Sequence, residues 1–374
     1  MAGIIQEQHA DRCRLFMQWK EMDWPILVDS FNRLQVAAVP ITLLIDEHGV
    51  IRKLRARPED LEDFLETDYP KPEVAVAATP TRDWIRRRLQ RDAGDAAQSK
   101  DLALDLVEWG DAGQLTAGIE MLELSKAGSP DDGWLRFRLG VAYRRRYDSA
   151  GRRDGDFAQA VANWAEALAI DPNQYIWRRR IQQYGPRLDK PYAFYDWVPE
   201  ARKAIEKRGG SPVPLVVEPG GAEFARPLKR FEARGDVVLN PDPSGRVARD
   251  AEGFIAVETT VVPATQGSST AARVHLVFRP NQGIKAHWNS EAEGAVIWLD
   301  SPKGWKLERQ RFEIPNDAGP VSDRPRSVEF EALRDSDAGD VDAVLTGYAL
   351  YYACEDVDGL CVYRRLDFRV ELGR

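Results

Sequence analysis

Two cysteines near the C-terminus have a spacing that could support a disulfide bond and thiol chemistry. Cys354 and Cys361 flank a short acidic segment that contains the turn signal Asp358-Gly359. The strand-like sequences on both sides predict a hairpin that can place the two cysteines opposite each other. Opposed residues in an antiparallel pair have Cα atoms as close as ~4.5 Å, and a disulfide accepts Cα distances of ~4.4–6.8 Å. We therefore expect the two sulfur atoms to lie within bonding reach.

The alternation of residues after Cys361 predicts where its side chain points. Every second residue from Val362 onward belongs to a mainly apolar set, which we take as the core face of the strand. Cys361 alternates with these residues, so it should face away from the core and be partly accessible. The candidates for shielding the sulfur atoms are the nearby aromatic residues Tyr351, Tyr352 and Tyr363.

Two interpretations of the cysteine pair are open. It is either a redox centre, or a static bond or two reduced thiols at the end of a hairpin. Glu355, Asp356 and Asp358 raise the pKa of a neighbouring thiol, which disfavours Cys354 as an attacking nucleophile. A disulfide that is attacked by a partner's thiolate is less affected, because the partner supplies the nucleophile.

The elements that must position these cysteines lie in residues 211–374. This part is rich in Val, Gly, Pro and aromatic residues, with repeated turn signals between short apolar runs. Seven or so such strands predict an antiparallel β-sandwich. The expected strands cover residues 236–239, 254–262, 272–279, 295–300, 328–332, 343–353 and 361–372.

Residues 250–372 resemble the disulfide-bond-corrector family, the immunoglobulin-like N-terminal domain of DsbD-type proteins. The resemblance is carried by residues 278–280 with 285–289, by residues 298–305, and by the aromatic strand that ends in Cys354. It implies that Cys354 and Cys361 cycle between disulfide and dithiol and exchange electrons with a thioredoxin-like or other redox protein, in an extracytoplasmic compartment. The spacing departs from the family, because six residues separate the cysteines where five are commonest.

Residues 80–207 form a region rich in Arg, Ala, Leu and Trp that predicts helices. Within it, residues 134–172 resemble a tetratricopeptide repeat, in which Gly140 would permit close helix packing. The matching small, aromatic, small and proline positions are Ala160, Trp164, Ala167 and Pro172. A full solenoid needs about three repeats for stability, so we expect a short helical array that packs against a neighbouring domain.

Two arginine clusters lie in this helical region. They could bind acidic peptides or phosphate groups, or they could be solvated helix faces that balance acidic neighbours. The clusters are Arg144, Arg145, Arg146, Arg152 and Arg153, and Arg178, Arg179 and Arg180.

Residues 1–68 read as an α/β fragment, and residues 3–67 resemble the second half of a thioredoxin-like redoxin domain. The most specific element is Val39-Pro40 ahead of an apolar strand, which implies a cis peptide bond at Pro40. The family's first strand and its cysteine-bearing helix would precede Gly3, so we expect a partial domain without the catalytic cysteine motif. Cys13, on the next helix, is either a small buried residue or a reactive thiol.

Composition excludes several classes of function. With 52 basic and 60 acidic residues the net charge is −8, so we expect no nucleic-acid partner. Four histidines and three cysteines give no metal-binding spacing, and we expect no cofactor. No apolar run approaches the ~18 residues of a membrane helix, so we expect no transmembrane segment. The pattern of a signal peptide is also not visible at the N-terminus.

The sequence therefore supports two hypotheses. The first is a thiol–disulfide exchange accessory protein that could act as an oxidoreductase, with Cys354 and Cys361 as its redox centre. The second is a non-catalytic interaction scaffold, with a degenerate redoxin domain and a structural disulfide. Neither the oligomeric state nor the direction of electron flow follows from the residues.

Overall fold

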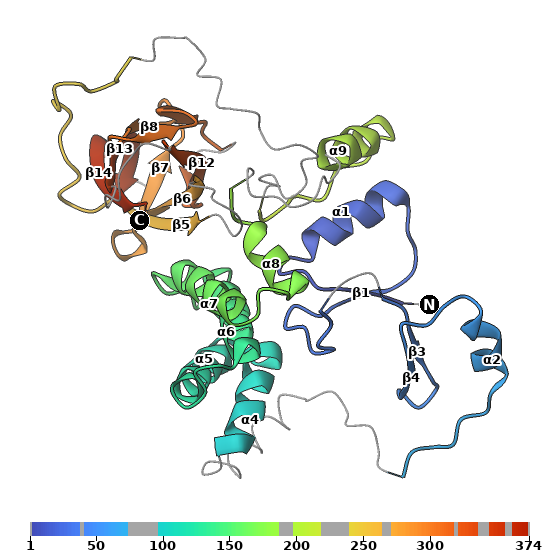
Figure 1. The fold of residues 1–374 in the computed structure, drawn as a ribbon. Coiled ribbons are helices and arrows are strands. Elements are labelled where there is room, and N and C mark those ends of the chain that lie inside the picture. The colour runs from blue at the N-terminus through green and yellow to red at the C-terminus, as the bar shows by residue number, and fades with distance from the viewer. Residues whose placement is uncertain are drawn as a thin grey trace. The chain divides into compact units, whose positions relative to one another are not determined.

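The chain folds into helices and mostly antiparallel sheets, as a computed structural model shows (Figure 1). The structure describes residues 2–37, 41–73, 96–186, 197–217, 239–263, 271–317, 321–335, 344–355 and 361–372. The expected mixed α+β class is confirmed. Contacts within the chain define two compact units, Met1–Gln8 with Trp24–Arg180, and His9–Asp23 with Ile181–Arg374.

Short strands open the first unit. Strand β1 (Gly3–Ile5) pairs in parallel with β2 (Ile26–Val28), and β3 (Leu43–Ile45) pairs antiparallel with β4 (Ile51–Leu54). Helix α2 (Asp60–Glu66) follows. Within the described residues these strands form two separate two-stranded sheets.

The turn between β3 and β4 is closed by the side chain of Asp46. The Asp46 carboxylate accepts hydrogen bonds from the backbone N–H groups of His48 and Val50, both at 2.9 Å. Gly49 has a φ of 78°, a conformation that favours glycine. Pro40, with its expected cis bond, lies outside the described residues.

Five helices are described between residues 96 and 182. They are α4 (Ala96–Trp109), α5 (Ala112–Ala127), α6 (Gly133–Tyr147), α7 (Asp156–Ile170) and α8 (Tyr175–Gln182). Helix α4 packs on α5, and α6 packs on α7. Asp111 begins α5 with a capping box to Gln114, and Asp132 caps α6 by accepting from the Leu135 N–H.

Gly140 allows α6 and α7 to approach closely. A Cβ atom at this position would lie 2.4 Å from the ring of the fully buried Trp164. The two helices are also joined by a buried ion pair, with Arg146 Nη2 2.6 Å from Asp156 Oδ1. The expected close packing at Gly140 is therefore present.

The first arginine cluster is matched by acceptors of its own unit. Arg145 donates to backbone carbonyls of α4, and the other four arginines form ion pairs. These pairs are Arg144–Asp148, Arg146–Asp156, Arg152–Asp154 and Arg153–Glu120. In the second cluster, Arg180 is buried and donates to Gln8 Oε1 and to the carbonyls of Gln6 and Ser30. These contacts favour the interpretation of balanced charge over an open anion site.

Two further helices pair in the second unit. Helix α1 (Asp11–Lys20) buries Leu15 against α9 (Trp197–Lys207), and the rings of Trp19 and Trp197 stack at 6.1 Å. Cys13 lies on α1 and is partly exposed.

Two antiparallel sheets form the C-terminal part, which we call the two-sheet region. One sheet has the order β5-β6-β12-β9. Its strands are β5 (Ile255–Pro263), β6 (Ala271–Pro280), β12 (Arg326–Arg334) and β9 (Trp305–Leu307). The other has the order β10-β8-β13-β7-β11, with β14 added beside β13. Its strands are β10 (Arg311–Ile314), β8 (Ala295–Asp300), β13 (Val344–Glu355), β7 (Ala286–Asn289), β11 (Val321–Ser322) and β14 (Cys361–Glu371).

One apolar core joins the two sheets. It takes Val274, Leu276 and Phe278 from β6 and Phe368 and Val370 from β14. The strands face each other across this core (Figure 1). In β14 the buried residues alternate with exposed ones, as the sequence predicts for a strand with one face in the core.

Candidate functional site

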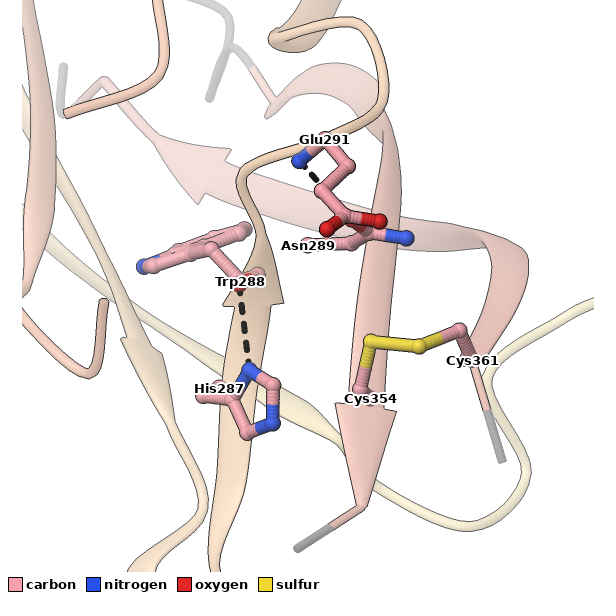
Figure 2. The surroundings of a disulfide bond; sticks show 6 residues. All are labelled: His287, Trp288, Asn289, Glu291, Cys354 and Cys361. Carbon is pink, nitrogen blue, oxygen red and sulfur yellow. Dashed lines mark hydrogen bonds between the residues drawn. A yellow bond between two sulfur atoms is a disulfide. The ribbon is translucent and has the colours of Figure 1, made fainter. Parts of the chain in front are cut away.

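The two C-terminal cysteines form a disulfide between neighbouring strands. Cys354 on β13 lies directly opposite Cys361 on β14 (Figure 2). The sulfur atoms are 2.01 Å apart and the Cα atoms 4.0 Å apart. The expectation that the two sulfur atoms lie within bonding reach is confirmed.

The hydrogen bonds of β14 explain why the two Cα atoms are so close. The Arg365 N–H donates to the Ala248 carbonyl at 2.9 Å, and the Arg365 carbonyl accepts from the Asp250 N–H at 3.0 Å, so both groups point away from β13. Backbone direction repeats every second residue, so Cys361 has the same orientation. Cys354 and Cys361 are therefore a non-hydrogen-bonded pair, the class with the shorter Cα separation.

The two cysteines of the disulfide differ in their exposure to solvent. Cys354 is only 4% exposed, because β13 has β14 on one side and β7 on the other. Cys361 is exposed at the start of β14. Among the described strands β14 pairs with β13, and its other edge is bridged at Arg365 by residues 248–250. The bond runs from β13 to β14, so its accessible end is Cys361 (Figure 2). This confirms the expectation that at least one cysteine is accessible.

A histidine lies on the other side of Cys354. His287 is directly opposite Cys354 in the β7–β13 ladder, so His287, Cys354 and Cys361 form one row across three strands (Figure 2). The histidine is 8% exposed, and its Nδ1 is 3.1 Å from the Trp288 carbonyl oxygen. A carbonyl only accepts hydrogen bonds, so Nδ1 carries a proton in this arrangement.

Two of the three expected tyrosines share the face of the disulfide. Tyr352 and Tyr363 are the next cross-strand pair on that face, with ring centroids 4.5 Å apart. Tyr363 is 38% exposed. Burial, with the neighbouring Tyr352 as the next cause, raises the pKa of Tyr363. These two rings border the disulfide.

Tyr351 lies on the opposite face of β13, which corrects its assignment as a shielding residue. It belongs to the core, where its ring meets Trp288 edge-on at 5.8 Å. Its hydroxyl donates to Asp250 Oδ2 at 2.5 Å. Burial and this hydrogen bond to a carboxylate raise the pKa of Tyr351 well above its ordinary value. Side chains alternate along a strand, so its neighbour Tyr352 faces the disulfide instead.

Residues 239–250 cover the other end of this sheet face. The Asp242 N–H donates to the Tyr348 hydroxyl at 3.0 Å, and Arg365 lies over the Tyr348 ring while its Nη1 is 2.8 Å from Asp242 Oδ2. Burial acts to raise the pKa of Asp242, but the hydrogen bonds from Arg365 and two backbone N–H groups lower it below its usual value. This cover sits over Tyr348 and Leu350, and the disulfide lies at the far end of β13.

A second polar cluster, which the sequence did not predict, lies on β6 and β12. Glu329 Oε2 is 2.5 Å from Arg273 Nη2, and Glu329 Oε1 is 3.2 Å from His275 Nδ1. The other ring nitrogen of His275 is 2.8 Å from the Tyr184 carbonyl oxygen, so the ring is held between Tyr184 and Glu329. Burial acts to raise the pKa of Glu329, but the adjacent His275 and Arg273 hold it well below its usual range.

The described part of the chain offers no cluster of three or more His, Cys, Asp or Glu side chains that could hold a metal ion. Among the helices described, none has the length and apolar character needed to cross a membrane.

Comparison with protein-family models and with curated proteins gives no match. Among solved structures, the GAE domain of yeast GGA1 is 12% identical, with a TM-score of 0.16 over 31% of this chain and 91% of that chain. The GAE domain of GGA2p from Saccharomyces cerevisiae is 12% identical, with a TM-score of 0.18 over 32% and 90%. A FixG-related protein from Vibrio parahaemolyticus is 7% identical, with a TM-score of 0.16 over 31% and 94%. Scores this low assign neither fold nor family.

Proposed function

We propose that this chain is a thiol–disulfide exchange protein whose redox centre is the Cys354–Cys361 pair. The observation that carries the proposal is the asymmetry of the bond, which has an exposed sulfur-bearing residue on an edge strand and a buried one on the adjacent inner strand. A thiolate that attacks a disulfide approaches along the axis of the bond. The edge of the sheet at β14 is open to this approach on Cys361, while Cys354 is the leaving sulfur.

A partner with two thiols supplies all the electrons and protons that the exchange needs. A partner thiolate attacks Cys361 Sγ, the Cys354–Cys361 bond breaks, and Cys354 leaves as a thiolate. The second thiol of the partner, after losing its proton, attacks the partner sulfur of the mixed disulfide and releases Cys361 as a thiolate. The partner loses two electrons and two protons, and the Cys354–Cys361 pair gains both.

The finer domain assignments belong to the same proposal. The two-sheet region acts as an immunoglobulin-like sandwich that presents the disulfide. Residues 1–68 are a partial redoxin domain, and the helices around residues 134–172 are a tetratricopeptide-like array. The partner is a protein of the thioredoxin-like class with two closely spaced thiols. Persistent protein disulfides belong to oxidising compartments, so the proposed site of action is extracytoplasmic.

A second candidate function rests on a different observation, a pocket on the helical region. The pocket has a volume of about 410 Å³. It is lined by Ile119, Leu124 and Tyr143 among others, and Leu124 is 78% exposed. A protein that inserts an apolar side chain here would use the chain as a scaffold, and the disulfide would then be static.

An electron-transfer experiment with a dithiol protein distinguishes the exchange function from the scaffold function. Reduced thioredoxin is mixed with the chain in a Cys13→Ser background, and the remaining thiols are counted by alkylation. The proposal expects one thioredoxin dithiol to be oxidised for each chain, and none with Cys354→Ser or Cys361→Ser. A thioredoxin that keeps only its first cysteine should form a mixed disulfide with Cys361. A disulfide that stays intact in folded protein while thioredoxin stays reduced supports the scaffold instead.

A further inference from the structure

The edge of β12 that faces away from β6 is paired along only part of its length. Strand β9 pairs with it at Ala332–Arg334, and the Glu308 N–H donates to the Glu331 carbonyl at 2.9 Å. The main-chain groups of Glu331 therefore point to this edge. Backbone direction repeats every second residue, so those of Ser327 and Glu329 do the same. Among the described strands, none pairs with this edge at Ser327 or Glu329, so it offers their N–H and C=O groups to another strand.

A groove lined by β12 and β10 lies at this edge, and we call it the edge groove. It has a volume of about 380 Å³. Its apolar wall consists of Phe312 and Ile314 from β10 and of Val328 and Phe330 from β12. The rings of Phe312 and Phe330 have centroids 5.7 Å apart. Phe312 and Ile314 lie at the margin of the core and are only partly buried. An apolar side chain in the groove would therefore remove further apolar surface from water.

We propose that the edge groove binds an extended segment of a partner protein, which joins β12 as an additional antiparallel strand. Strand addition of this kind draws affinity from main-chain hydrogen bonds and specificity from pockets for alternate side chains. The edge groove supplies both, because Ser327 and Glu329 line it together with the apolar wall. The pairings of β12 with β6 and β9 are antiparallel, and we expect the same orientation for the added strand.

The charges of the edge groove indicate the chemistry of the segment. Acidic side chains outnumber basic ones in the lining, with Glu308, Glu313, Glu329 and Glu331 against Arg273 and Arg309. Opposite charges on neighbouring strands attract and like charges repel, so a segment with basic side chains is favoured over an acidic one. A second copy of this chain fits poorly, because two β12 edges would bring their own glutamates together. Charged edges also discourage unselective pairing.

Antiparallel pairing determines which residues of the segment take each role. Residues that form hydrogen bonds with Ser327 or Glu329 have their side chains on the same outer face of the sheet as these two residues. The residues between them turn their side chains into the groove, on the face of Val328 and Phe330. The expected segment therefore alternates basic residues at the hydrogen-bonded positions with apolar residues at the groove positions.

Fluorescence anisotropy of a labelled peptide tests the proposal with the full chain. The probe is a short peptide in which lysine and valine alternate, and we expect saturable binding. Methylation of the lysine amide nitrogens removes the donors that face β12 and should raise the Kd about tenfold or more. Methylation of the valine amide nitrogens, which point away from β12, is the matched control and should leave the Kd unchanged. A peptide with glutamate in place of lysine should bind at least about tenfold more weakly.

A change in β12 itself locates the binding. Ser327→Pro removes an N–H group that points to the groove and not to β6, so it should weaken binding about tenfold. Ser327→Ala keeps this N–H group and should bind the probe like the parent protein. If Ser327→Pro does not fold, hydrogen exchange of the parent protein decides, because the Ser327 and Glu329 amides must exchange more slowly when the probe is present.

Three results would overturn the inference. They are a probe that does not bind, equal weakening by both methylated peptides, and exchange at Ser327 and Glu329 that the probe leaves unchanged. The edge groove lies on β10 and β12, whereas the disulfide joins β13 to β14. The peptide experiments therefore stand apart from the exchange function, and either proposal can fail without the other.

Discussion

Tyr352 and Tyr363 face each other across β13 and β14 with ring centroids 4.5 Å apart, on the same face as the disulfide. The pair lies one step along that face from Cys354 and Cys361. It therefore borders the approach to the exposed sulfur from one side. We expect this arrangement to restrict which thiols can align with the bond.

Removal of the exposed Tyr363 ring should make the Cys361 sulfur more accessible from this side. We expect Tyr363→Ala to increase the rate of reduction of the disulfide by dithiothreitol about three- to tenfold, because an obstacle to in-line attack is lost. Tyr363→Phe keeps the ring and should react like the parent protein. Stopped reactions analysed by thiol alkylation give the rates. Equal rates for Tyr363→Ala and the parent would show that the ring does not limit access.

Helix packing in the first unit gives an independent prediction. Gly140→Ala places a Cβ atom 2.4 Å from the Trp164 ring and 2.9 Å from the Ala160 carbonyl oxygen. We expect it to lower the free energy of unfolding by about 1–3 kcal/mol, although alanine is the better helix former by about 1 kcal/mol. Gly113→Ala on α5 meets its nearest atom, Asp111 Oδ1, at 3.5 Å and should be neutral or stabilising. Urea unfolding of both variants checks the difference, and equal stabilities would contradict the packing.

These helices show what sequence patterns can and cannot predict. Gly140 and Trp164 occur at spacings that indicate close helix packing, because a helix face is set by local periodicity. The partners of Arg146 and Arg180 could not be predicted in this way. Asp156 and the carbonyls of Gln6 and Ser30 reach them only through tertiary contacts. The sequence therefore left both interpretations of the arginine clusters open.

The buried ion pair between α6 and α7 should be costly to break. Asp156→Leu leaves Arg146 buried without its carboxylate, and we expect a loss of about 3–5 kcal/mol in the free energy of unfolding. The double variant Arg146→Met/Asp156→Leu removes both charges and should recover most of this loss. Thermal unfolding followed by far-UV circular dichroism measures the three proteins. A double variant as unstable as Asp156→Leu would mean that packing, not charge, sets the cost.

The Glu329 cluster predicts a stability that depends on pH. The neighbouring His275 and Arg273 hold the pKa of Glu329 below its reference value of 4.5 despite its burial. Its contribution is therefore fully present above about pH 4.5 and is lost as the pH falls toward the lower pKa of the folded state. Glu329→Gln should be destabilised by about 3–5 kcal/mol at pH 7, with a smaller difference from the parent at pH 3.

Urea unfolding at several pH values checks this prediction. Glu313→Gln is the control, because Glu313 is exposed on β10 and its removal should change stability by less than about 0.5 kcal/mol. A difference between Glu329→Gln and the parent that does not shrink below pH 4.5 would contradict the charge assignment.

The pairing of Cys354 with Cys361 could be predicted from the sequence better than the residues that surround the disulfide. The turn signal and the alternation around Cys361 depend on neighbours in sequence, and they indicated both the pairing and the exposed face. The alternation did not decide which face of β13 is buried, so both Tyr351 and Tyr352 were candidates for shielding the disulfide. The structure places Tyr351 in the core. His287 lies on β7, a strand of four residues without clear alternation, and reaches Cys354 only through the pairing of distant strands. Short strands such as β9 and β11 escaped prediction for the same reason.

The reduction potential of the Cys354–Cys361 pair tests the central claim most directly. The protein, in a Cys13→Ser background, is equilibrated with thioredoxin and glutathione buffers, and the fraction of disulfide is measured by alkylation and mass. The exchange function predicts a reversible potential between about −120 and −270 mV, the range of disulfide oxidoreductases. A potential below about −300 mV is typical of a structural disulfide and would contradict the claim.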